Sequence, residues 1–239
     1  MEITWLGHSA FLIEGYNRII VDPFFIDNPM TQMLPDEVVC DMVCVTHGHS
    51  DHVGDAVAVS KRNKAPILAI LELANFFKKV GCETVAFNIG GSAKVKDTKI
   101  TMTNAVHSSG ADADGLEGAS GAATGFIIES GGTVYHAGDT ALFSDMALIG
   151  EMHQIDVALL PIGGFFTMDA IHAAKAVELL KPKIAIPMHY NTWNEIQADP
   201  VVFKSEVERR CKTQVRILDP GQSVKIDVGG RRYARDPHS

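Results

Sequence analysis

The chain has 239 residues, of which 46% are hydrophobic and 21% charged, and its formal net charge is −8. That composition predicts a single globular domain over residues 1–239. No run of about eighteen apolar residues is present, so we expect no membrane span. The negative charge disfavours broad binding to nucleic acid backbones. The N-terminus enters a strand pattern at once, without a basic region and an apolar core, so we expect no signal peptide and a cytoplasmic location.

Strand patterns dominate the chain, and helical patterns are interspersed among them. Alternating or continuous apolar residues between turn signals predict strands at 2–6, 10–14, 18–21, 41–46, 66–70, 84–87, 93–95, 99–106, 124–129, 133–137, 156–160, 184–188, 215–218, 223–228 and 231–233. Helices are expected at 54–60, 71–80, 141–149, 169–180 and 200–210. We expect Asp169 to cap its helix and Gly81 to end another. This order predicts an α/β protein with two packed sheets and helices outside.

The most informative stretch is residues 46–52, with the sequence THGHSDH. It places His47, His49, Asp51 and His52 directly after a predicted strand, where sites in α/β proteins usually form. Neutral imidazole and carboxylate are natural ligands of zinc, manganese and iron ions. The alternative is a polar surface turn, but solvated loops rarely concentrate histidine in this way. The stretch therefore predicts part of a metal site.

Three further candidate ligands share one property, which is that each follows a predicted strand. They are His107, Asp139 and His189. If these strand ends meet at one edge of a sheet, they join the first cluster. The combined set of five histidines and two aspartates is large enough for two divalent metal ions with open positions for water or substrate. Zinc is the first candidate, and manganese, nickel and iron are alternatives.

Two other residues are candidates for roles beside the metals. His8 lies at a strand turn and would either contact substrate or bond to the backbone as a structural histidine. Asp22 would either accept the second N–H of a ligating histidine or simply end its strand, where Pro23 biases it towards an extended backbone. The remaining histidines are expected to have structural or surface roles: His136, His153, His172 and His238.

Residues 108–121 form the one low-complexity stretch, rich in glycine, serine and acidic residues. A domain linker there would separate residues expected to share one site, so we interpret the stretch as a mobile loop beside that site. This loop and the stretch 24–33 are the candidate contacts of a homo-oligomer.

The heptapeptide resembles the His-x-His-x-Asp-His signature of the metallo-β-lactamase superfamily. The later residues are similar to the family's other ligands and occur in the same order: His107, then Asp139 in AGDT, then His189 in PMHY. The N-terminal WLGHSAF narrows the resemblance to a branch of small metal-dependent hydrolases similar to L-ascorbate-6-phosphate lactonase. The resemblance covers nearly the whole chain and implies a four-layer αββα sandwich with the site at one edge.

The resemblance also implies a role for each ligand. One metal would be held by His47, His49 and His107, the second by Asp51, His52 and His189, and Asp139 would bridge them. His49 stands where the di-iron redox members of the superfamily tend to have glutamate, and no flavodoxin-like domain is evident, so a redox role is disfavoured.

The expected activity is hydrolysis of a small, anionic ester, lactone or phosphoester. A hydroxide bridging two metals would attack the carbonyl or phosphoryl centre, and the metals would stabilise the oxyanion. Asp51 would orient the hydroxide or accept its proton, and His8 would bind substrate or protonate the leaving group. The alternatives are a phosphodiesterase or nuclease of the same fold, a mononuclear iron oxygenase, and a metal-binding protein without turnover.

Overall fold

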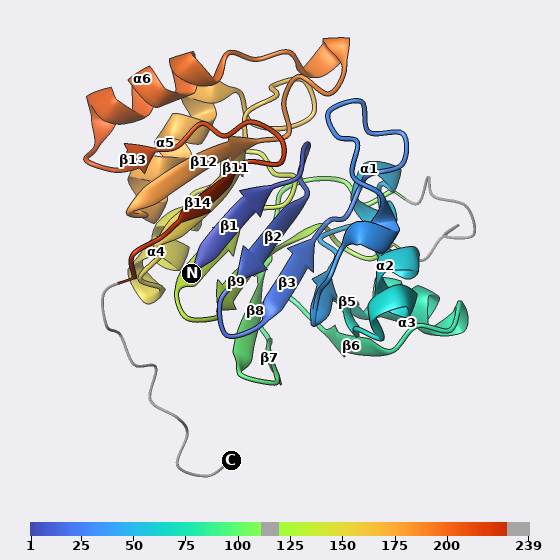
Figure 1. Cartoon of the computed structure of the whole chain (residues 1–239). Coiled ribbons are helices and arrows are strands. Elements are labelled where there is room, and N and C mark those ends of the chain that lie inside the picture. Colours follow the sequence, from blue (N-terminus) through green and yellow to red (C-terminus); the bar gives the residue numbers. More distant parts are fainter. Residues whose placement is uncertain (111–119, 229–239) are drawn as a thin grey trace.

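The structure is a computed structural model that describes residues 1–110 and 120–228. Two seven-stranded sheets pack against each other, and the helices lie on their outer faces (Figure 1). Helices α1, α2 and α3 cover one sheet, and α4, α5 and α6 cover the other. The predicted αββα arrangement is therefore confirmed. No helix of the described residues is long and apolar enough to cross a membrane.

The first sheet has the strand order β14-β1-β2-β3-β4-β5-β6. In chain order its strands are β1 (Glu2–Trp5), β2 (Phe11–Glu14), β3 (Arg18–Val21), β4 (Met42–Cys44), β5 (Ile67–Ile70), β6 (Thr84–Phe87) and β14 (Ser223–Lys225). The second sheet has the order β13-β12-β11-β10-β9-β8-β7. Its strands are β7 (Ser92–Val95), β8 (Thr98–Asn104), β9 (Thr124–Glu129), β10 (Thr133–His136), β11 (Val157–Pro161), β12 (Ile184–Met188) and β13 (Gln214–Val215).

The helices connect these strands. They are α1 (Ser50–Val53), α2 (Ala56–Asn63), α3 (Leu71–Lys79), α4 (Met146–Met152), α5 (Ala170–Leu180) and α6 (Pro200–Arg210), with 3₁₀ turns η1 (Pro35–Glu37) and η2 (Asn194–Ile196). The predicted caps are present, since Asp169 accepts a hydrogen bond from the His172 N–H at 2.7 Å and Gly81 follows α3 with φ of 87°.

Both sheets change from antiparallel to parallel pairing at corresponding places. In the first sheet β14, β1, β2 and β3 are antiparallel and β3 to β6 are parallel. In the second sheet β7 to β10 are antiparallel and β10 to β13 are parallel. The parallel strands read as continuous apolar runs because sheet and helices bury both of their faces. Their carboxyl ends carry the candidate site, as expected for α/β proteins.

The structure corrects several sequence-based predictions. The helix expected at 141–149 begins only at Met146, because the Ala141 N–H donates to the Val106 carbonyl and holds this stretch as a loop. The helix expected at 54–60 is α2, which begins only at Ala56 and runs to Asn63, and Gly54 separates it from the additional short helix α1. The strands expected at 215–218 and 223–228 are the shorter β13 and β14. The strand expected at 231–233 lies outside the described residues.

Ser130 joins the two sheets at the end opposite the strand ends that carry the site. This fully buried residue follows β9, and its hydroxyl accepts the N–H groups of Tyr16 and Asn17 at 3.0 and 3.3 Å. Gly15, in the turn between β2 and β3, passes so close that a Cβ there would lie 1.6 Å from the Ser130 carbonyl oxygen. The close packing of these two hairpins therefore requires glycine at position 15.

We expect Gly15→Ala to lower the free energy of unfolding by about 3 kcal/mol, because the new methyl group must push the hairpins apart. Gly81→Ala is the matched control: nothing lies within 4 Å of its Cβ position, but its φ is 87°. That variant should lose about 1 kcal/mol, from backbone conformation alone. Chemical denaturation of both variants measures the difference, and equal losses would contradict the packing argument.

Candidate metal centre

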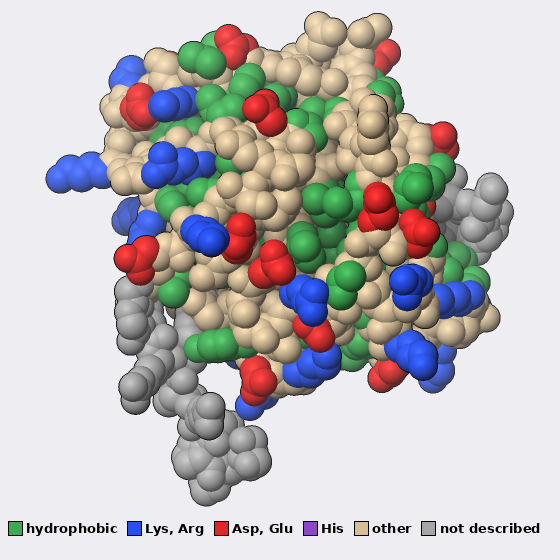
Figure 2. Space-filling model, viewed as in Figure 1, with side chains coloured by type: hydrophobic (Ala, Val, Ile, Leu, Met, Phe, Trp, Pro, Cys, Tyr) green, Lys and Arg blue, Asp and Glu red, His purple; other side chains and the backbone are tan. Residues whose placement is uncertain are grey.

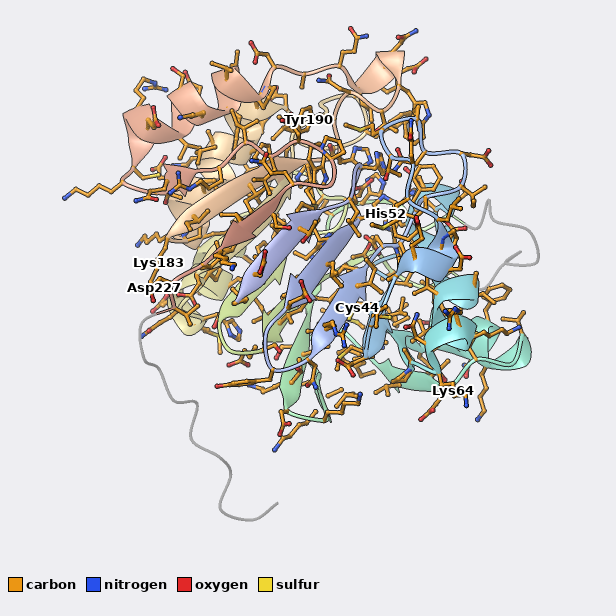
Figure 3. All side chains as sticks on the ribbon, viewed as in Figure 1. Cys44, His52, Lys64, Lys183, Tyr190 and Asp227 are labelled. Carbon is orange, nitrogen blue, oxygen red and sulfur yellow. The ribbon has the colours of Figure 1, made fainter. Side chains whose placement is uncertain are left out.

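The heptapeptide 46–52 leaves the carboxyl end of β4 and turns into the helical turn α1. His47 and His49 lie in the loop, whereas Asp51 and His52 lie on α1 itself. Figure 3 shows His52 beyond the strand ends and Cys44 within the first sheet. Another segment packs closely against this loop, because a Cβ at Gly48 would lie 2.9 Å from the Gly110 carbonyl oxygen.

Asp22 lies behind this cluster and is fully buried. Its carboxylate accepts the Thr46 N–H at 2.8 Å and the Thr46 hydroxyl at 2.7 Å. It also accepts the Nδ1–H of His52 at 2.8 Å, which leaves Nε2 of that ring free to bind a metal. Of the two roles expected for Asp22, the structure thus favours the acceptor. The expected extended backbone is wrong, since φ of Asp22 is 45°, a conformation that these three bonds hold in place.

Thr46 extends the same network to His47. Its hydroxyl proton goes to Asp22, so its oxygen accepts the Nδ1–H of His47 at 3.0 Å. The opposite ring nitrogen, Nε2 of His47, then approaches Nδ1 of His49 to 2.8 Å. Two imidazole nitrogens with lone pairs face each other in this way when a proton or a metal ion lies between them.

The structure brings together all seven predicted ligands, and His8 joins them. Candidate ligand atoms lie within 4.8 Å of one another in three groups: His47, His49 and His107; His47, His52 and Asp139; and His8, Asp51, His52 and His189. Because His47 and His52 each occur in two groups, the three groups form one continuous cluster. It is built by both sheets, since His107 and Asp139 follow β8 and β10 and His189 follows β12.

The electrostatics of the cluster favour a cation. Burial raises the pKa of Asp139, but His189 and His52 outweigh it and hold that pKa well below its usual range. Burial lowers the pKa of His52, but the carboxylates of Asp139, Asp51 and Asp22 outweigh it and raise that pKa well above its usual range. A buried site that attracts a proton so strongly attracts a metal ion for the same reason.

The histidine chemistry fits a metal as well. Burial, followed by the nearby His52, lowers the pKa of His47 well below its usual range, so this ring stays in the neutral form that coordinates metals. Three buried atoms of the cluster have no hydrogen-bond partner, namely Nε2 of His52, Oδ1 of Asp139 and Nδ1 of His189. Unpartnered buried polar atoms are costly unless something else binds them. The donor set therefore fits a metal ion.

His8 lies behind Asp51 and is fully buried. Its Nε2–H donates to Asp51 Oδ2 at 3.0 Å, and its Nδ1 accepts the Thr192 hydroxyl proton at 2.7 Å. Burial, followed by the charge of His189, lowers the pKa of His8 to about 4, consistent with this neutral tautomer. His8 thus bonds to side chains, an arrangement that neither sequence-based alternative described.

The cluster opens into a cleft of about 870 Å³. The residues of the cluster that line it are His49, Asp51, His107, Asp139 and His189. The other lining residues are Phe24, Ile26, Asp27, Ser50, Gly54, Asp55, Ser108, Phe166 and Trp193. Sequence analysis did not single out Phe24, Phe166 or Trp193, because a lone aromatic residue carries no motif, and it assigned no role to Thr46 or Thr192.

The remaining histidines lie apart from the candidate ligands. His136 is buried and bonds to backbone, with Nε2–H donating to the Ser9 carbonyl at 3.0 Å and Nδ1 accepting from Gly138. His172 is exposed and contacts Asp169 on α5, His153 is half-buried, and His238 lies outside the described residues. The described ends of the stretch 108–121 lie beside the site, since Ser108 Oγ is 3.4 Å from His49 Nε2. Its central part, 111–119, lies outside the described residues.

This fold and this cluster are shared with known proteins. Residues 2–189 match the family model described as the β-lactamase superfamily domain. The chain is 50% identical over 230 residues to the UPF0173 metal-dependent hydrolase of Methanopyrus kandleri, covering 94% of this chain and all of that protein. It is 45% identical over 227 residues to the one from Methanosarcina mazei, covering 95% and 99%. The chain therefore belongs to the metallo-β-lactamase superfamily and, within it, to the UPF0173 metal-dependent hydrolase family.

A solved structure supports the same grouping. Igni18, a metallo hydrolase from the hyperthermophilic archaeon Ignicoccus hospitalis, superimposes with a TM-score of 0.85 at 40% identity, covering 93% of this chain and 97% of that one. The superfamily resemblance predicted from the sequence is thereby confirmed.

Asp22→Asn should weaken metal binding by about 10- to 100-fold, because an amide cannot accept from Thr46 and His52 as the carboxylate does. The matched control is Asp41→Asn, since Asp41 also accepts a backbone N–H, from Arg18 at 2.8 Å, but pairs with Lys96 at the surface. Competition with a chromophoric chelator measures both affinities. Unchanged affinity in Asp22→Asn would show that the network does not support the ligands.

Proposed function

We propose that the protein is a hydrolase that uses two divalent metal ions to cleave a small ester, lactone or phosphoester. The observation that carries this proposal is the continuous cluster of imidazole and carboxylate groups at the base of the cleft. His47, His49 and His107 would hold one ion, Asp51, His52 and His189 the other, and Asp139 both. Zinc suits this donor set best, and manganese, nickel and iron are the alternatives.

When bound, two such ions would supply a hydroxide near neutral pH and a Lewis acid for the substrate oxygen. The residues of the chain prepare that chemistry. Asp139 is held ionised, Asp22 and Thr46 fix the ring orientations of His52 and His47, and no serine or cysteine nucleophile is required. Asp51 reaches the cleft and is the group placed to hold or accept a proton there.

His8 takes a different role from the one its sequence position suggested. It does not line the cleft, so we propose that it is a positioning residue for Asp51 rather than a group that contacts substrate. The Asp51 carboxylate can only accept a hydrogen bond, so it fixes the tautomer of His8 with the Nε2–H pointing at the carboxylate. The fixed hydrogen bond keeps Asp51 ionised and oriented towards the second metal position.

The surface gives no support to a polynucleotide substrate. Acidic and basic side chains are interspersed on the face shown in Figure 2 rather than gathered into a basic patch. Together with the net charge of −8, this favours a small molecule over nucleic acid. A cytoplasmic location and self-association stay predictions.

Asp139→Ala is expected to lower hydrolysis by about 10³-fold and to reduce bound metal from about two equivalents to one or fewer, because the shared ligand is lost. His172→Ala, which removes an exposed histidine on α5, serves as the control and should change neither quantity. Elemental analysis and a panel of esters, lactones and phosphoesters provide the measurements. Full metal content and activity in Asp139→Ala would refute the proposed centre.

A further inference from the structure

The outer half of the cleft differs in chemistry from its base. Phe24 and Trp193 form one aromatic wall, with ring centroids 6.2 Å apart, and the rings of both lie beside His8. Ile26 and Phe166 complete the mouth and are 49% and 54% exposed, while Trp193 is 37% exposed. Large apolar side chains left in water beside a polar reaction site mark a place where an apolar ligand group binds.

The charges around the cleft have a single sign. Among the fourteen lining residues of the described chain, four are aspartates and none is lysine or arginine. Asp51 and Asp139 belong to the candidate metal centre, and Asp55 accepts the N–H groups of Phe25 and Ile26. Asp27 remains exposed at the mouth. An anionic group on the distant part of a substrate would find no cationic partner here and would be repelled by Asp27.

The apolar wall is also built to be rigid. The carboxylate of Asp55 accepts the N–H groups of Phe25 and Ile26 at 2.8 and 3.0 Å, and Asn28 Nδ2 donates to the Phe24 carbonyl at 2.9 Å. Gly54 lets this loop approach, because a Cβ there would lie 2.4 Å from the Pro23 carbonyl oxygen. A preformed wall binds a ligand without an ordering cost.

We propose that this outer half is a subsite for an uncharged aromatic or aliphatic group, so that the preferred substrates are esters or lactones whose remainder is apolar and neutral. The subsite deepens the proposed hydrolase function and rests on it for the position of the bond that is cut. It replaces the anionic substrate expected from the sequence, because the metal ions are the only cationic groups that the described cleft would offer.

Binding can be measured without hydrolysis, using the intrinsic fluorescence of the metal-loaded protein. The chain has two tryptophans, of which Trp5 is 1% exposed and Trp193 lines the cleft. Titration with neutral 4-phenylbutanamide should therefore change the Trp193 emission in a saturable way. Trp193→Phe should abolish the signal, and Phe166→Ala should weaken binding about tenfold, while Tyr16→Ala, which removes a half-exposed aromatic ring outside the cleft lining, should have no effect.

Kinetics with a matched pair of esters tests the charge preference. 4-Nitrophenyl butyrate and mono-4-nitrophenyl succinate have the same leaving group. The acyl chain of the butyrate ends in a methyl group, and that of the succinate ends in a carboxylate. The kcat/KM for the butyrate should be at least about tenfold higher than that for the succinate. Asp27→Asn should lower the ratio of the two kcat/KM values about threefold by removing the repelling charge. Asp41→Asn is the control for a distant surface carboxylate and should leave this ratio unchanged.

The two measurements separate the subsite from the hydrolase function. Saturable amide binding that depends on Phe166, without hydrolysis of any ester, would support the subsite and refute the proposed reaction. Hydrolysis with equal rates for the two esters, or amide binding that Phe166→Ala leaves unchanged, would overturn the subsite and leave the reaction standing.

Discussion

The hydrogen bonds of Asp22 are the interaction on which the candidate metal centre depends. One buried carboxylate at the end of β3 binds the backbone and hydroxyl of Thr46, and through them it fixes His47 as well as His52. Two candidate ligands, one proposed for each metal ion, therefore share one anchor. A buried carboxylate without these bonds would be strongly destabilising, so the chain cannot keep Asp22 without the heptapeptide that satisfies it.

A backbone hydrogen bond beside the site joins the second sheet to the first. The His8 carbonyl accepts the His189 N–H at 3.0 Å and the Trp5 indole N–H at 2.9 Å, which joins the turn after β1 to the end of β12. His8, Asp22 and His189 all have positive φ, at 53°, 45° and 53°. Such conformations cost free energy in non-glycine residues and persist where surrounding bonds impose them. For His8 and His189 the bond between the two sheets does so, and for Asp22 the bonds to Thr46 and His52 do so, which locates the strain at the site.

The sequence was sufficient for the fold class and for the set of residues that meet at the site. The heptapeptide is a local motif, and His107, Asp139 and His189 each follow a strong strand pattern, so topology alone predicts that they converge. The role of His8 could not be predicted from the sequence, because its partners Asp51 and Thr192 are 43 and 184 residues away. The walls of the cleft could not be predicted either, since Phe24, Phe166 and Trp193 come from three loops and no sequence pattern links them. The start of α4 was missed because the hydrogen bond from Ala141 to Val106, which follows β8, overrides local helix propensity.

The cleft thus combines two environments that the fold keeps apart. Its base is polar and favours positive charge. None of the described lining residues is lysine or arginine, and metal ions would supply that charge. Its mouth is apolar and carries negative charge at Asp27. It is held by Asn28, on the connection between β3 and β4 that begins at Asp22, and by Asp55, which precedes α2. A substrate that satisfies both environments offers an electron-rich oxygen at one end and neutral apolar surface at the other. Under the proposed function, the metal ions would select the bond that is cut and the loops would select the molecule, and those loops can vary without disturbing the buried anchor at Asp22.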